Sequence, residues 1–299
     1  MIFITWLVHC LLLILSVAFF TLFERKVIRA FHLRTGPNKV SFIGLVQPLL
    51  DAFKLLTKQV LTPIRANRFV YGLSPVIALF IALFVWTTIP NYYMLLSINY
   101  SIVLFFCLGS ILVFAVLLAG WSSNSKYRLI GRLRSIAQSI SYESVFSTLI
   151  VILIVFITSY SIRSLFTQSS ILFLIFFPLW VICTLAETHR APFDFAEAES
   201  ELVSGFNTEY SGAYFAFCFL SEYIILLYSC FLITYIFFIW ALPIRIIVIV
   251  SVSIFLSFFF TWIRITYCRF RYDILIIMSW KMLLPLTLCI FLCFIPIIL

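Results

Sequence analysis

Long apolar runs separated by short polar segments set the pattern of this chain. A transmembrane helix needs about 20 mostly apolar residues, and eight stretches meet or nearly meet that length. They are apolar on all sides, whereas membrane strands would alternate in polarity. We predict an all-α, polytopic membrane protein forming a single domain over residues 1–299, with about eight transmembrane helices. These spans are Ile2–Phe23, Tyr71–Ile89, Ile102–Trp121, Ile140–Tyr160, Ile171–Ala186 (short and containing Pro178), Ala213–Trp240, Ile246–Ile263 and Met282–Leu299.

The first polar segment has a helical pattern of its own. Polar residues recur on one face (Gln47, Asp51, Lys54, Lys58), and apolar residues occupy another (Leu45, Leu49, Ala52, Leu56, Val60). Pro48 is tolerated in a first helical turn. The spacing predicts an amphipathic helix that is too short and too charged to span, lying flat at the membrane surface. From the pattern alone it is either a simple anchor or the doorway for a lipid-soluble ligand.

Composition and charge agree with this architecture. The chain is 64% hydrophobic and 10% charged, with a mean hydropathy of +1.19, whereas soluble domains carry roughly 25% charged residues. With the predicted spans, 18 of the 20 Lys and Arg residues fall in loops on one side. The positive-inside rule then places both termini outside. The net charge of +9 is thus a topology signal, and we expect no nucleic-acid partner.

Acidic residues gather in one part of the chain. Seven of the eleven lie between residues 187 and 222. Asp194, Glu197 and Glu201 have the spacing of one helix face, and Pro192 suits a first turn, so a solvated loop helix is one interpretation. Glu143 and Glu222 instead lie inside apolar stretches, where an ionisable residue is a functional hypothesis by default. Neighbouring carboxylates in a low dielectric titrate together and can pass protons, which is the second interpretation.

Motifs for a bound cofactor are missing from the sequence. The eight cysteines are scattered without a CxxC pair, and the three histidines lie in different segments. Buried structural thiols are therefore favoured over a metal or cluster site. No GxGxxG or Walker loop occurs. We expect no metal site, no catalytic side chain and no redox cofactor held by this chain itself.

Eight motifs follow one another along the chain: FERKV, RTGPNKV, QPLLDAFKLLTKQ, GWSSNSKY, SYE, AETHRAPFDFAEAESELVSGFNTEYSG, SEY and RFRYD. In this order they resemble the subunit 1 family of NADH:ubiquinone oxidoreductase, respiratory complex I. The resemblance runs from the first span to the last, and the long acidic motif is highly specific. Because no transit-peptide pattern is visible, it is the mitochondrially encoded form that the chain resembles. We therefore expect a multi-pass protein of the mitochondrial inner membrane, with both termini toward the intermembrane space.

The resemblance implies a function. Such a subunit is a core membrane subunit of the proton-pumping enzyme and builds much of the ubiquinone access tunnel. It also carries an acidic path that couples quinone reduction to proton translocation. Ubiquinone would be the substrate, while NADH, FMN and iron–sulfur clusters would belong to partner subunits. The implied partners are membrane lipid, the quinone-site subunits of the hydrophilic arm, small membrane subunits and antiporter-like subunits.

The resemblance also assigns residues, motif by motif. At or near the quinone cavity it places Glu24, Arg25, Arg34, Asp51, Ala52, Phe219, Arg269 and Arg271. To the acidic path it assigns Glu143, Glu187, Asp194, Glu197, Glu199, Glu201 and Glu222. The chain departs from the usual pattern at Ala198, Arg29 and Thr35, where Gly, Gly and Lys are more usual, which affects the expected shape of the loops.

Two other functions remain open at this point. One is the related membrane subunit of a membrane-bound hydrogenase, which shares ancestry. The other is an unrelated secondary transporter. Many transporters show internal repeats or paired broken helices, and the acidic motif has no second copy in this sequence.

Overall fold

The computed structural model describes residues 2–89, 99–157, 159–162, 175–194, 210–238 and 245–298. Every regular element within these ranges is helical, as predicted. The long helices are α1 (Ile2–Phe31), α3 (Arg68–Val85), α4 (Ser101–Ser122), α5 (Lys126–Ile157), α9 (Gly212–Phe237), α10 (Arg245–Thr266) and α12 (Leu284–Ile298). The shorter elements are η1 (Phe42–Gly44), α2 (Gln47–Thr57), η2 (Trp86–Thr88), α7 (Phe177–Glu187), α11 (Tyr272–Ile277) and the π-helical η7 (Met278–Leu283).

Seven of the described helical segments are long and apolar enough to cross a membrane. They are α1, α3 with η2, α4, α5, α9, α10 and the continuous run from α11 into α12. Large apolar side chains stay exposed on their outer faces, for example Phe114 on α4 and Phe255 on α10. A bilayer accommodates such a surface, so the chain is a multi-pass membrane protein. Of the fifth predicted span, Ile171–Ala186, residues 171–174 lie outside the described ranges, and most of the rest forms the 11-residue helix α7.

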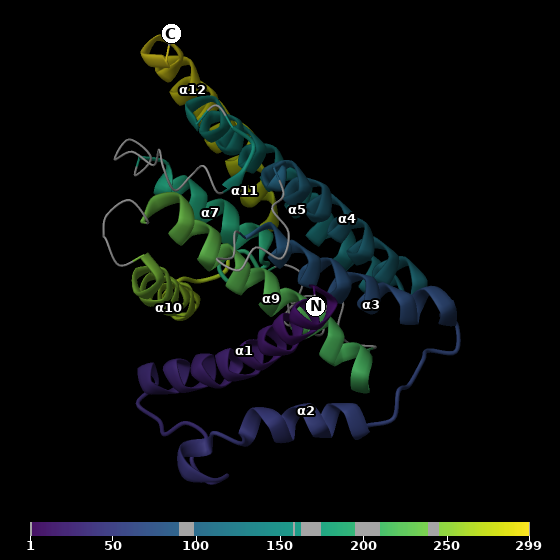
Figure 1. Cartoon of the computed structure of the whole chain (residues 1–299). Helices are drawn as coiled ribbons and strands as arrows, with labels where there is room; N and C mark the ends of the chain where they lie inside the picture. Colours follow the sequence, from purple (N-terminus) through teal and green to yellow (C-terminus); the bar gives the residue numbers. More distant parts are fainter. Residues whose placement is uncertain are drawn as a thin grey trace.

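Helix α9 lies at the centre of the packing. Its apolar window is 56% buried, against 17% for the peripheral α4. It contacts α1, α2, α3, α7 and α10, and Figure 1 shows it crossing the middle of the molecule. Polar contacts also join η2 to α9, because Trp86 Nε1 donates to the carbonyl of Ile224 at 3.2 Å and the hydroxyls of Thr88 and Tyr228 lie 2.8 Å apart. The two polar residues Glu222 and Tyr223 are therefore carried by the most enclosed helix.

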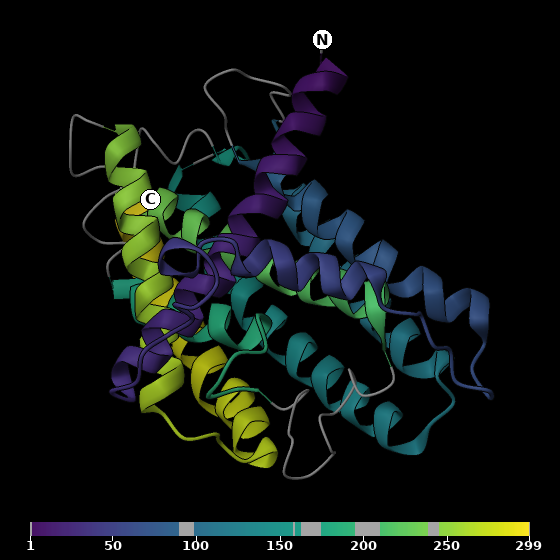
Figure 2. The same ribbon diagram turned by 90° about the horizontal axis from the view of Figure 1, so that it is seen from below.

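The amphipathic helix predicted from the sequence is confirmed as α2, with Pro48 in its first turn. It packs against α1 and α9. Figure 1 shows it apart from most of the long helices, and in Figure 2, seen from below, it crosses in front of α9. The chain after α2 meets the start of α9, where the amide of Leu61 donates to Ser211 Oγ at 2.7 Å. Gly212 has a φ of +57° there, and a Cβ would lie 2.7 Å from the carbonyl oxygen of Lys58. A glycine is therefore required at this contact.

Several helices extend beyond the predicted spans. Helix α1 continues to Phe31, α5 starts at Lys126 in a segment predicted as a polar loop, and the last span starts at Tyr272 rather than Met282. The reason is that polar residues interrupt the apolar pattern of a lipid-facing segment but do not interrupt the helix. Arg128 on α5, for example, is buried against protein, and straight-chain polar residues are good helix formers.

Candidate functional site: a buried ionic junction and two acid-lined cavities

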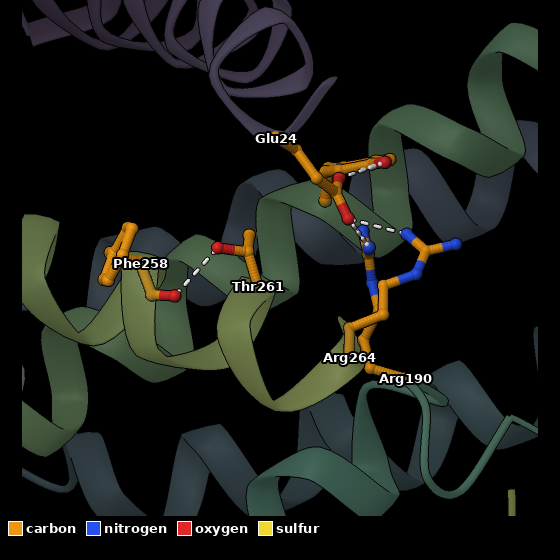
Figure 3. A network of polar contacts seen from close by, with 6 residues as sticks. Glu24, Arg190, Phe258, Thr261 and Arg264 are labelled. Atoms are coloured by element: carbon orange, nitrogen blue, oxygen red, sulfur yellow. Dashed lines mark hydrogen bonds and ion pairs between the residues drawn. The ribbon is translucent and has the colours of Figure 1, made fainter. Parts of the chain in front are cut away.

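Glu24 forms the centre of a buried ionic cluster. Its Oε1 accepts hydrogen bonds from Arg190 Nη1 and Arg264 Nη1, both at 2.6 Å, and its Oε2 accepts one from the Tyr223 hydroxyl at 2.7 Å. Figure 3 shows the two guanidinium groups converging on this carboxylate. The Arg190 guanidinium also lies over the Tyr223 ring, 4.3 Å from its centroid. We call these four residues the Glu24 junction.

The junction ties four parts of the chain together. Glu24 comes from the extension of α1, Tyr223 from α9, Arg264 from the last turn of α10 and Arg190 from the segment after α7. Burial lowers the pKa of Arg190, but the charge of Glu24, together with smaller contributions from Tyr223 and Glu222, raises that pKa above its usual value. Arg190 is thus held in its charged form. Two guanidinium groups share one carboxylate, so the junction carries an excess of positive charge.

Phe219 extends the junction along α9. Its ring stacks on that of Tyr223 at 6.1 Å between centroids, and it contacts Phe215 at 4.6 Å. The structure therefore brings Phe219 and Glu24, two of the predicted quinone-cavity residues, to either side of Tyr223.

A second ionic contact joins α1 to α2. Arg25 Nη1 lies 2.5 Å from Asp51 Oδ2, and Gln47 Nε2 donates to Asp51 Oδ1 at 3.0 Å. Arg34, in the loop between these helices, and Ala52, on α2, are both exposed. Four predicted quinone-cavity residues therefore lie on the exposed α1–α2 region.

The remaining predicted basic residues lie near the start of α11. Arg269 Nη2 is 3.8 Å from Asp194 Oδ2, and the Phe193 and Phe270 rings stack beside them with centroids 5.8 Å apart. Asp194 thus contacts a predicted quinone-cavity residue rather than either cavity described below. Arg271 pairs with Asp273 at 3.0 Å on an exposed surface, and among the described residues no hydrogen bond or ion pair joins it to the Glu24 junction.

Two neighbouring cavities enclose the other described acids. The first, which we call the Glu222 cavity, lies between α3, α4, α5 and α9, and its ionisable lining is Arg132, Glu187, His189, Cys218 and Glu222. The second, the Glu143 cavity, is lined by Glu143, Glu187, His189 and Tyr228 together with apolar residues of α3, α4 and α9. Glu187, Thr188 and His189 line both. The end of α7 and the two residues after it therefore supply the polar part of the wall that the two cavities share, and Leu112, Val116 and Ile225 supply its apolar part.

Buried cations flank the Glu222 cavity on α5. The Arg128 guanidinium lies over the rings of Tyr210 and Tyr71, at 4.0 and 5.0 Å from their centroids, and such contacts stabilise a desolvated cation. Arg132 fits closely against α4, because a Cβ on Gly120 would lie 2.5 Å from Arg132 Cγ. The cavity therefore combines a positive wall with the acids Glu187 and Glu222.

The described residues do not cover the whole predicted acidic path. Glu197, Glu199 and Glu201, which were predicted to continue it, lie outside the described residues. Within the described ranges, no group of three or more His, Cys, Asp or Glu side chains is placed to hold a metal ion.

Comparison with known proteins assigns this chain to a family. The sequence profile of the NADH dehydrogenase family matches residues 4–295. The chain belongs to the NADH dehydrogenase family. It is 45% identical over 287 residues to NADH-ubiquinone oxidoreductase chain 1 of Aedes aegypti, covering 94% of this chain and 90% of that protein. Proteins of the same name from Heterololigo bleekeri and Tetraodon nigroviridis are each 43% identical, covering 95% and 92% of this chain and 93% and 88% of theirs.

Membership in the NADH dehydrogenase family makes the chain a core membrane subunit of an oxidoreductase complex. The family resemblance stated from the motifs is thereby confirmed. This membership also excludes the alternative that the chain is an unrelated secondary transporter.

Sequence reasoning missed several residues of this NADH dehydrogenase subunit. Arg190 and Arg264 were counted only as topology signals, and Tyr223 was quoted only within the SEY motif. Arg190 directly follows the ETH of the acidic motif, and a lone basic residue among acids was an available signal. His189 was considered only as one of three histidines that lie in different segments.

Proposed function

We propose that this subunit forms part of the passage by which ubiquinone enters the complex, and that its acids couple quinone reduction to proton translocation. The observation that carries the proposal is the shared lining of the two cavities. Glu187 faces both, with Glu222 on one side and Glu143 on the other. A chain of carboxylates separated only by cavity space is what proton transfer through a helical bundle requires.

The quinone part of the proposal rests on the α1–α2 region and the Glu24 junction. Helix α2 exposes Leu49, Leu50, Phe53 and Leu56, an apolar surface suited to an isoprenoid tail. The Glu24 junction lies farther along, where α1 meets α9 and α10, and its excess positive charge suits the polar, electron-accepting headgroup. In this proposal Arg25, Arg34, Asp51, Ala52 and Phe219 border the passage, and Arg269 and Arg271 lie near its polar end.

The second part of the proposal concerns the acidic path. Glu222, Glu187 and Glu143 are its described members, and we assign Asp194, Glu197, Glu199 and Glu201 to its loop portion. Among the described residues, neither Glu143 nor Glu187 forms an ion pair, in contrast to Glu24. A carboxylate without a fixed cation is able to change its protonation state, whereas a paired one is held ionised.

The same proposal gives the location of the subunit and its neighbours. The subunit is a single domain of the mitochondrial inner membrane, with both termini toward the intermembrane space and its basic loops in the matrix. NADH, FMN and iron–sulfur clusters belong to other subunits. Its neighbours are the quinone-site subunits of the hydrophilic arm, small membrane subunits and antiporter-like subunits.

Glu→Gln substitutions in the assembled complex test the acidic path. Gln keeps the shape and hydrogen-bonding capacity of Glu but cannot titrate. We expect Glu187→Gln to lower quinone-linked turnover and proton pumping most, on the order of tenfold or more, because Glu187 lines both cavities. Glu143→Gln and Glu222→Gln should lower both by smaller factors. NADH oxidation by an artificial acceptor, which takes electrons before the quinone site, should be unchanged.

Lys281→Gln is the control for loss of a charge, because Lys281 is exposed and lies outside both cavities. It should leave quinone-linked turnover and pumping at wild-type levels. An assembled Glu143→Gln, Glu222→Gln double variant with unaltered turnover and pumping would contradict the proposal.

A further inference from the structure

His189 occupies a position that the proposed acidic path does not yet explain. It lines both cavities next to Glu187 and Thr188, and the other residues that line both, Leu112, Val116 and Ile225, are apolar. Its backbone has a φ of +50°, in the left-handed region that non-glycine residues seldom adopt. The chain therefore turns sharply at this residue, and its side chain lies at the wall that the two cavities share.

The imidazole also has an unfilled hydrogen-bonding position. The side chain as a whole is partly buried, yet Nδ1 is fully buried and has no hydrogen-bond partner within the described ranges. A buried polar atom without a partner costs free energy comparable to a lost hydrogen bond. Buried water commonly fills such positions where a cavity is polar. A histidine that lines two cavities with carboxylates, and that has a ring nitrogen without a partner, points to contact with those carboxylates through water.

We propose that His189 is a relay residue between the Glu222 cavity and the Glu143 cavity. This inference rests on the proposed acidic path and adds to it a member that is not an acid. The groups around it are Arg132, Glu187, Cys218 and Glu222 in one cavity, and Glu143, Glu187 and Tyr228 in the other.

The chemistry of a neutral imidazole suits this role. Burial, and then the charge of Arg132, lower the pKa of His189 to about 4, so the ring is neutral near pH 7. A neutral ring presents one donor and one acceptor nitrogen. A proton arriving through water binds at Nδ1, and the proton already on Nε2 leaves to the next acceptor. The ring keeps its charge overall, and a ring flip restores the first orientation of the N–H group without returning the transferred proton.

Two substitutions in the assembled complex separate a relay from a structural role. Asn tolerates the left-handed backbone and offers a donor and an acceptor, but it cannot exchange protons between two nitrogens. We expect His189→Asn to lower quinone-linked turnover and pumping several-fold and to enlarge the solvent deuterium isotope effect on turnover. Oxidation of NADH by an artificial acceptor should be spared. His189→Gln should behave in the same way, and His32→Asn, at an exposed histidine, is the matched control.

The outcomes are distinguishable from those of the proposed function. Wild-type turnover and isotope effect in His189→Asn, with Glu187→Gln impaired, would overturn the relay and leave the acidic path standing. Wild-type behaviour in both variants would overturn the path and the relay together. Failure of both His189 variants to assemble would also overturn the inference, since it would make His189 a folding residue.

Discussion

Glu24 and Arg25 are neighbours in sequence, yet their ion pairs lie in opposite environments. The Glu24 side chain is 4% exposed and accepts hydrogen bonds from two arginines and a tyrosine. The Arg25 side chain is 52% exposed and, among the described residues, forms an ion pair only with Asp51, which is itself 33% exposed. One residue faces α9 and α10 inside the bundle, and the other faces α2 at its edge.

The difference shows that burial, rather than the presence of charge, decides what an ion pair does. A buried charge that loses its partner leaves an uncompensated group, at a cost of about 3–5 kcal/mol. An exposed pair competes with water and ions and contributes about 0–1 kcal/mol. The Glu24 junction therefore fixes the relative positions of α1, α9 and α10, whereas the α1–α2 contact leaves α2 less constrained.

The largest effect is expected from Glu24→Gln. The substitution removes the carboxylate charge and leaves Arg190 and Arg264 facing each other without compensation. We expect a loss of about 3 kcal/mol, the lower end of the range for buried pairs, because Arg264 is 36% exposed. The amount of assembled complex and its thermal stability in detergent measure this loss. A variant that assembles in wild-type amounts with an unchanged melting temperature would show that the junction is not a structural tie.

The sequence predicted the spans well but not this contrast. Glu24 and Arg25 follow the same apolar stretch, and both looked like the polar end of a span. Only the continuation of α1 to Phe31 places the two side chains on different faces of one helix. Arg190 and Arg264 join Glu24 across separations of 166 and 240 residues, and no local pattern encodes such a contact. The motif resemblance assigned Glu24 and Arg25 to one quinone cavity without distinguishing them.

The candidate acids show the same limit. The positions of Glu143 and Glu222 inside apolar stretches were sufficient to single them out, because membrane burial of a carboxylate is expensive. Glu222 lines one cavity with Glu187, and Glu143 lines the other with Glu187. These neighbours depend on how α5, α7 and α9 pack, which the sequence pattern does not show. His189 could not be predicted at all, since its role comes from the turn after α7. Periodicity identifies a helix and its exposed face, but it does not identify which polar residues of different helices meet.

Ala52→Trp should produce an intermediate effect that depends on the substrate. Ala52 is exposed on α2, next to the Arg25–Asp51 pair, and in the proposed function it borders the quinone passage. A bulky side chain there should lower turnover with long-tailed ubiquinone several-fold more than with a short-tailed analogue, because only the long tail must remain in the passage. Assembly should be unchanged. Steady-state rates with the two quinones in the same membranes measure the ratio, and equal reductions would indicate that α2 is only a surface anchor.

The smallest effect on stability is expected from Arg25→Gln. The substitution removes a charge beside Glu24 in sequence, but the pair it breaks is exposed, and Asp51 keeps its hydrogen bond from Gln47. We expect a loss below about 1 kcal/mol, and salt should reduce it further because exposed charges are screened. Thermal unfolding of the assembled complex at low and high ionic strength, alongside Glu24→Gln, measures both points. A loss for Arg25→Gln as large as that for Glu24→Gln would mean that the α1–α2 contact is buried in the complete enzyme. The contrast between the two neighbouring residues would then belong to the isolated chain alone.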